Sequence, residues 1–319
     1  MYHIIFSIPI HEKFEVVVDQ ICNIKHFNKN CGIVLHISKS FDNKESKISR
    51  EQFESIIKRI GDVWINPVSL RSGRSDIIQT YLSNFEYIKS LVDFEYFAFC
   101  ASNESFIKPG TYEYMRKFDW GSKNIVISSP EDWKFGKDLF QDSDLMGYLN
   151  SQTAKVVFSN AEGQFFKKEI FEQISQRITS FFDYKKIEVF YPREEIYFST
   201  IAACLTKTSR NPIGQIFTYS AYHFRFLWDV TRFEINNILK TSNNSFSVKR
   251  VDRKFNDNIR VLLRQKFGYG HELEEYVGEF IKQKSMSKLE IDKISLNKNS
   301  KQLLNNWKKV PKFFMNKWK

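Results

Sequence analysis

Two adjacent carboxylates, Glu194 and Glu195, follow Pro192 and directly precede the apolar run 196–205. Proline and acidic residues are common at the start of a helix, because the free N–H groups and the positive end of the helix dipole favour negative charge there. A carboxylate in that position, flanked by aromatic side chains, can instead serve as a general base in a partly desolvated pocket. Successive helical residues point about 100° apart, so we expect only one of the two carboxylates to face such a pocket.

A second group of candidates follows the strand-like aromatic segment 94–100. In an open α/β sheet, ligands bind just beyond the carboxyl ends of the strands. Ser102, Asn103 and Glu104 occupy that position and are therefore candidates for substrate contacts.

Basic residues lie at two places where an anion could bind. Arg71 and Arg74 stand in a Gly/Ser loop before the helix expected over 77–91, which is either an anion site or a pair of exposed arginines. Arg260, Arg264 and Lys266 share the helix expected over 257–267. Such charges can neutralise a diphosphate without a metal, or can simply form the solvated face of the helix.

One short pattern is compatible with a divalent cation. Asp142 and Asp144 form an Asp-x-Asp pair of the kind that many sugar-nucleotide enzymes use to hold a metal on a diphosphate. The pair lies some forty residues after the strand whose end should carry it. We therefore keep metal binding at this pair only as a minor alternative.

The elements that position these candidates begin with a strand over 3–10, a helix over 14–26 and a strand over 32–37. This βαβ opening predicts a mostly parallel sheet. The residues after the first strand, 8–12, contain no glycine, which disfavours a dinucleotide fingerprint and a P-loop. We expect further strands over 62–65, 94–100 and 222–229, helices over 52–60, 77–91, 112–117 and 170–178, and a loop-rich stretch over 118–160.

The composition is that of a chain without membrane spans. Hydrophobic residues make up 42% of the 319 residues, and no apolar run approaches the ~20 residues that cross a bilayer. The four cysteines have neither metal-ligand nor disulfide-framework spacing, and no signal peptide is evident, so we expect a cytoplasmic protein. The net charge is +11, and part of it lies in the segment 296–319, which has seven lysines, no acidic residue and several aromatics. That segment suits an anionic membrane surface, nucleic acid, or a solvated tail.

Seven motifs, in order, resemble those of the core-2/I-branching glycosyltransferases, the family that includes the peptide O-xylosyltransferases and bacterial members. They are HIIFSIPIHE, GIVLHISKS, RSGRSDIIQTYL, FAFCASNESFIKPG, GQFFKKEIFEQI, PREEIYFSTIAA and FRFLWD…VDRKF. The resemblance covers roughly residues 3–267. Three places depart from it. Ser38 stands where the family usually has an acidic residue near the nucleotide, Ser102-Asn103-Glu104 replaces an acidic-aromatic pair, and Trp228-Asp229 reverses the usual order.

The resemblance implies roles for individual residues. It makes Glu195 the catalytic base and Arg253 a diphosphate ligand, with Arg264 or Lys266 as a second basic partner. It implies an inverting reaction without a metal, in which basic side chains neutralise the leaving diphosphate. The nucleotide- or substrate-binding candidates are His11, Ser38, Arg74, Ser102, Asn103, Glu104 and Trp228.

These inferences combine into one prediction. We expect an α/β, glycosyltransferase A-like domain over 1–280, with a mostly parallel central sheet flanked by helices, a nucleotide-binding half (1–125) and an acceptor and catalytic half (126–280), followed by a basic aromatic tail (281–319). It would transfer sugar from a nucleotide-sugar donor to a bacterial surface glycan or its lipid-linked precursor, with no cofactor, and the tail would hold it at the inner membrane face. The alternative is a non-catalytic basic module that binds glycan or nucleic acid.

Overall fold

The structure is a computed structural model, which describes residues 1–281 apart from 40, 42–45, 47, 73–75, 153, 183–190, 209–210 and 221–228. The contacts divide the chain into two units, Met1–Gly278 and Glu279–Lys319. The description below concerns the first unit. The basic aromatic tail, from residue 282 onward, lies outside the described residues.

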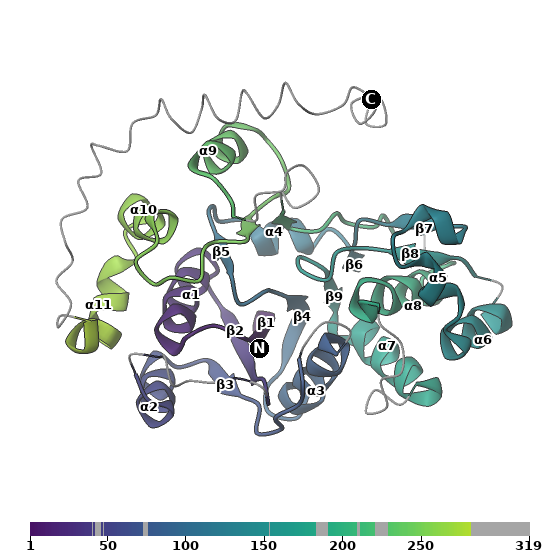
Figure 1. Ribbon diagram of the computed structural model, residues 1–319, viewed down its shortest axis with the longest axis horizontal. Helices are drawn as coiled ribbons and strands as arrows, with labels where there is room; N and C mark the ends of the chain where they lie inside the picture. The colour runs from purple at the N-terminus through teal and green to yellow at the C-terminus, as the bar shows by residue number, and fades with distance from the viewer. Residues whose placement is uncertain are drawn as a thin grey trace. The chain divides into compact units, whose positions relative to one another are not determined.

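A six-stranded sheet forms the centre of the first unit (Figure 1), with the strand order β3-β2-β1-β4-β9-β6. Its strands are β1 (Tyr2–Ile10), β2 (Cys31–Ile37), β3 (Val63–Ile65), β4 (Phe94–Phe99), β6 (Trp120–Gly121) and β9 (Phe165–Lys167). The first four are parallel, whereas β9 runs antiparallel to β4 and β6 antiparallel to β9. The α/β class with a mostly parallel central sheet is therefore confirmed.

Helices cover both faces of this sheet. In Figure 1, α1 (Phe14–Phe27) lies on one face, and α3 (Ile77–Lys89), α7 (Lys168–Phe181) and α8 (Tyr197–Leu205) lie on the other. The apolar residues of α3 recur every three or four positions, so one side of the helix packs on the sheet. That face shares a core with β1, β4, β9, α7 and α8, built from side chains such as Ile78, Leu82, Phe85, Phe97, Phe166, Phe171 and Phe198.

Two smaller sheets extend the unit. β10 (Thr218–Tyr219), β11 (Ser247–Lys249) and β5 (Glu104–Phe106) form one, and the antiparallel pair β7 (Ile125–Ile127) and β8 (Val156–Phe158) forms the other. Gly163 allows the β10–β11–β5 sheet to lie close to β4. Its φ is +84°, and its N–H donates to the Phe99 carbonyl at 2.9 Å. A Cβ at this position would lie 2.7 Å from the Thr218 backbone nitrogen. Any other residue would be strained there.

The remaining elements are α2 (Arg50–Ile60), α4 (Thr111–Met115), η1 (Pro130–Asp132), α5 (Gly136–Phe140), α6 (Ser143–Gln152), η2 (Arg193–Glu195), α9 (Arg232–Lys240), α10 (Asn258–Phe267) and α11 (Gly270–Ile281). The stretch 118–160, expected to be loop-rich, instead holds β6, β7, β8 and three short helices. These elements are two to ten residues long, so they are too short to show a hydrophobic period in the sequence. The strand expected over 222–229 lies outside the described residues except for Asp229. In the described part of the chain, no helix is long and apolar enough to span a bilayer.

Candidate active site

The paired carboxylates lie on the 3₁₀ turn η2, immediately before α8. The edge of β8 holds this turn in place: the N–H of Ser159 donates to the Glu195 carbonyl at 2.8 Å. One turn into α8, the Thr200 hydroxyl accepts from the N–H of Val157 at 2.9 Å. The carboxylates therefore precede the helix rather than forming its first turn, and they are fixed to a neighbouring strand.

Both carboxyl groups are shielded from water, to different extents. Glu194 is 7% exposed, and its Oε2 has no hydrogen-bond partner in the described structure. Burial and the neighbouring Glu195 raise the pKa of Glu194 to about 8. Glu195 is half-buried, and burial together with the negative charge of Glu162 raises its pKa to about 7. The less buried Glu195 thus loses its proton first, which gives a carboxylate whose basicity suits proton abstraction near neutral pH.

A polar cleft lies within electrostatic reach of Glu195. Its volume is about 340 Å³, and Lys123, Glu162 and Lys249 line it. Lys249 and Glu162 form an ion pair, which outweighs burial and holds the pKa of Glu162 below its ordinary value. These same three side chains also act on the charge of Glu195. The cleft therefore presents fixed charges and hydrogen-bonding groups beside the candidate base.

A buried polar cluster around Asp142 holds the η2 turn in place. The Asp142 carboxylate accepts from the hydroxyls of Tyr191 and Tyr197, at 2.5 and 2.9 Å, and pairs with Arg193 at 3.2 Å. Arg193 also lies 4.6 Å from the centre of the Phe182 ring. Asp142 also accepts from the N–H of Leu145 at the start of α6 at 3.2 Å, so its carboxylate is occupied by contacts within the protein. No cluster of three metal-ligating side chains occurs among the described residues.

A second hollow, of about 390 Å³, opens beyond the carboxyl ends of β1 and β4. The strand order reverses between these two strands, which is where open α/β sheets bind ligands. Two of the predicted site residues, Asn103 and Arg253, line it together. Arg253 is 66% exposed, and its Nε lies 3.3 Å from a carboxylate oxygen of Glu12. Glu12 is itself buried and accepts from the Ser102 hydroxyl at 3.1 Å.

Two further candidates follow strand ends, with His11 half-buried and Ser38 buried. His11 follows β1, and burial together with the charge of Arg253 lowers its pKa. Ser38 follows β2 and is 3% exposed. Between them His36, inside β2, accepts from the N–H of Leu70 through Nε2 at 2.9 Å, and burial followed by His11 lowers its pKa to about 4. Neutral imidazoles thus line this end of the sheet at physiological pH.

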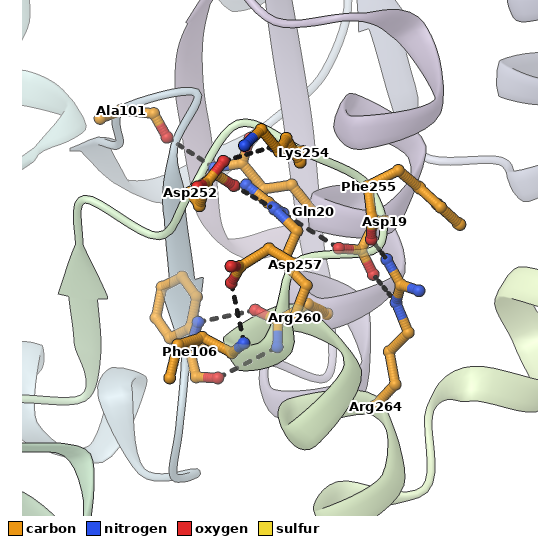
Figure 2. Close-up of polar contacts among 12 residues, drawn as sticks. Asp19, Gln20, Ala101, Phe106, Asp252, Lys254, Phe255, Asp257, Arg260 and Arg264 are labelled. Atoms are coloured by element: carbon orange, nitrogen blue, oxygen red, sulfur yellow. Dashed lines mark hydrogen bonds and ion pairs between the residues drawn. The ribbon is translucent and has the colours of Figure 1, made fainter. Parts of the chain in front are cut away.

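Arg264, expected on the diphosphate, is instead occupied by the protein. Figure 2 shows Arg264 and Arg260 of α10 pointing at Asp19 of α1, each at 2.9 Å. Arg264 also donates to the carbonyl of Phe255 and stacks on its ring. Lys266 lies near the far end of α10, with its ammonium 3.4 Å from Asn236 of α9. Arg264 is therefore held in the packing of α10 on α1, whereas the side chain of Lys266 is exposed.

Glu104 is also committed to the fold. Its carboxylate accepts from the Thr218 hydroxyl at 2.6 Å, from the Ser247 hydroxyl and from the N–H of Ala101 at 3.0 Å. These bonds join β5, β10 and β11, so we assign Glu104 a structural role in place of the predicted substrate contact. The candidates Arg74 and Trp228 lie outside the described residues.

No protein-family model and no curated protein matches the chain. Among solved structures, it is similar to the galactosyltransferase LgtC in complex with donor and acceptor sugar analogues, with a TM-score of 0.41, 9% identity, and coverage of 83% of this chain and 95% of LgtC. It is also similar to the apo form of the glycosyltransferase GlyE of Streptococcus pneumoniae, with a TM-score of 0.42, 12% identity, and coverage of 88% and 64%. At these scores, function has to be argued from the site itself.

Four residues of the site escaped sequence reasoning: Glu12, Lys123, Glu162 and Lys249. Two of them had a usable signal, because Glu162 directly precedes the Gly-Gln-Phe-Phe motif and Lys249 stands four residues before Arg253. Lys123 had none. It reaches the cleft only because the β6–β7 connection is held by Ser159, whose hydroxyl accepts from the Lys123 N–H at 3.1 Å.

Proposed function

We propose that the protein is an inverting, metal-independent glycosyltransferase with a glycosyltransferase A-like fold. The observation that carries this proposal is Glu195, a half-buried carboxylate with a pKa of about 7 beside a polar cleft. The sequence resemblance to the core-2/I-branching family supports the same role for Glu195. Glu195 takes the proton of the acceptor hydroxyl as that oxygen attacks the donor sugar and the nucleotide leaves.

The donor diphosphate binds in the hollow at the β1–β4 switch point. Arg253 supports this placement, since its guanidinium is largely exposed there and is oriented by the buried Glu12. A guanidinium offers paired N–H donors that match phosphate oxygens and neutralises the charge that develops on the leaving group. The acceptor then occupies the cleft beside Glu195. A base has to lie within hydrogen-bond reach of the proton it removes.

The decisive experiment compares Glu195→Gln with the wild type in donor turnover and donor binding. We expect turnover to fall at least a hundredfold, the lower end of the loss for a general base. Donor affinity should stay within twofold of the wild type, and Tm within ~1 °C. Full turnover by Glu195→Gln would remove the base assignment.

A thermal-shift screen with UDP, GDP, CMP and dTDP forms, with and without EDTA, identifies the donor class. A ligand at a hundred times its Kd stabilises the folded protein by about 2.7 kcal/mol.

The alternative function is a non-catalytic basic module that binds glycan or nucleic acid. Its observation is the net charge of +11, part of which lies in the tail. It predicts glycan or nucleic-acid binding with no turnover of any nucleotide sugar by the wild type. EDTA-sensitive turnover would instead contradict the metal-independent mechanism.

A further inference from the structure

The cleft beside Glu195 is built mainly from groups that hydrogen-bond sugars. Besides its charged residues, it is lined by the polar side chains of Asn160, Gln215, Tyr219, Ser220, Asn244 and Ser245. Asn160 contributes a buried Oδ1 that has no partner in the described structure. A volume of about 340 Å³ accommodates a sugar residue or two. The cleft therefore has the size and lining of a glycan subsite.

The two lysines of this cleft differ in how their charge is satisfied. Lys249 is paired with Glu162, and both side chains are mostly buried. Lys123 is half-buried, yet its ammonium has no hydrogen bond or ion pair with any described residue. Burial lowers the pKa of Lys123, whereas the charges of Glu195 and Glu162 oppose that shift. A half-buried ammonium without an ion-pair partner in the described structure can bind an anion that enters the cleft.

We propose that this cleft recognises an acidic acceptor glycan, whose carboxylate or phosphate group binds the Lys123 ammonium. This inference rests on the proposed function for the direction of transfer, because the cleft adjoins the base and so holds the acceptor. Glu162 lies in the same cleft and would repel an anion, but its charge is already balanced by Lys249. Of the charged residues that line the cleft, Lys123 is then the cation without an ion-pair partner in the described structure.

The donor diphosphate is the competing anion, and the structure provides it with other partners. Arg253, Arg250 and Asn103 line the separate hollow near the ends of β1 and β4 together with Asp229 and Asp252, and Lys123 does not line it. The two anion sites are joined by one short segment, because Lys249 and Arg253 lie four residues apart. An acidic acceptor at one end and a diphosphate at the other would thus each meet their own cation.

The test measures glycan binding by calorimetry to the full chain. The probes are a glucuronic-acid-terminated oligosaccharide, its carboxyl-reduced form, the corresponding sugar phosphate, and UDP. The variants are Lys123→Gln, Lys123→Arg and a matched control, Lys155→Gln, which removes an exposed lysine before β8. We expect Lys123→Gln to lower the affinity for the acidic probes roughly tenfold or more, the usual loss for a hydrogen bond to a charged group. The affinity for the carboxyl-reduced probe should be unchanged. Lys123→Arg should restore most of the affinity.

Each other outcome overturns the inference. Equal binding of acidic and reduced probes, or an equal loss for Lys155→Gln, means that Lys123 reads no acidic group. A loss confined to UDP would assign the Lys123 charge to the donor. Comparing uronate with sugar phosphate tells which acidic group the cleft prefers. Binding and turnover separate this inference from the proposed function. A Lys123-dependent preference for acidic glycan without any donor turnover would refute the proposed function but leave the acidic-glycan specificity standing. Turnover with neutral acceptors alone would support the proposed function and refute the acidic-glycan specificity.

Discussion

At the scale of single residues, the site depends on two neighbouring carboxyls that differ in burial. Glu194 is buried, whereas Glu195 is half-buried and lies within electrostatic reach of the cleft-lining charges, so the same side-chain chemistry can take two roles. Desolvation favours the neutral form of both groups, and it does so more strongly for the one that is more deeply buried. Two predictions follow from this difference.

The first concerns the pH dependence of transfer. The pKa of Glu195 is raised to about 7, and the base has to be deprotonated to accept a proton. We expect kcat/KM to rise about tenfold per pH unit below that value and to level off above it. Rates measured between pH 5.5 and 8.5 check this limb; a profile flat from pH 5.5 upward would show a base of ordinary acidity.

The second concerns stability. The pKa of Glu194 is about 8 in the folded protein against an ordinary 4.5, so between these values the native state retains a proton that the unfolded chain has lost. The free energy of unfolding therefore falls as pH rises through this window. Glu194→Gln removes the effect, and its Tm should gain on the wild type by roughly 2 °C or more between pH 5 and pH 9. Glu131→Gln, at an exposed carboxylate, is the control; a Tm difference independent of pH would contradict the burial argument.

At the scale of elements, short segments reach the site through buried polar contacts rather than through the main core. The Asp142 cluster ties η2 to the start of α6. The Asp19 clamp ties α10 to α1, and Arg260 of that clamp also donates to the carbonyl of Asp252, next to Arg253, at 2.7 Å. In both cases, the charge holds a segment in position and does not meet substrate.

Removing the Asp142 carboxylate should therefore damage the fold and the site together. Asp142→Ala leaves the Arg193 charge buried without its partner, a loss that costs about 3–5 kcal/mol, and it frees the η2 turn that carries Glu195. Urea unfolding and turnover measure the two effects. Asp144→Ala is the matched control, since Asp144 is exposed and should be nearly neutral. Equal losses of activity without loss of stability in both variants would instead favour the metal-binding alternative.

The family resemblance assigns both Arg253 and Arg264 to the diphosphate, but we expect their substitutions to have different effects on Tm and donor affinity. Arg264→Met breaks the clamp on Asp19, so we expect a lower Tm and donor affinity within about threefold of the wild type. Arg253→Met removes an exposed guanidinium, so we expect an unchanged Tm and donor affinity reduced roughly tenfold or more. Donor titration and thermal denaturation of both variants test this. The opposite pattern would reverse the assignment.

At the scale of the whole molecule, the charge of the C-terminal segment bears on where the protein is located. The segment 296–319 has seven lysines with interleaved aromatics, the composition that attracts a protein to an anionic bilayer surface. We propose that it holds the enzyme at the inner membrane face, near lipid-linked acceptors. Deleting 296–319 should abolish binding to liposomes with anionic lipids, and 0.5 M salt should weaken wild-type binding. Unchanged binding by the truncated chain would remove the membrane proposal.

The sequence by itself determined the elements with strong periodicity. The opening strand, helix and strand fall within one or two residues of β1, α1 and β2, and the helix after Pro192 begins at Tyr197, one residue from its expected start. These segments are rich in apolar residues with a clear strand or helix pattern, so the local sequence is enough to predict them. The position of Asn103 beyond β4 followed from the strand pattern, whereas Arg253 was predicted only through the family resemblance.

Which charges are exposed to a ligand depends on the tertiary structure. Arg253, Arg264, Glu104 and Asp142 are equivalent in the sequence as charged residues near motifs. In the fold all four have partners, but three of them are enclosed by the protein, whereas Arg253 remains largely exposed at a hollow. Their partners are distant in the chain; Asp19 and Arg264, for example, are 245 residues apart. Pairing over such separations depends on how helices and strands dock, which no local pattern encodes. The ammonium of Lys123 became a candidate ligand for the same reason, because its burial and its lack of a partner in the described structure exist only in the folded chain.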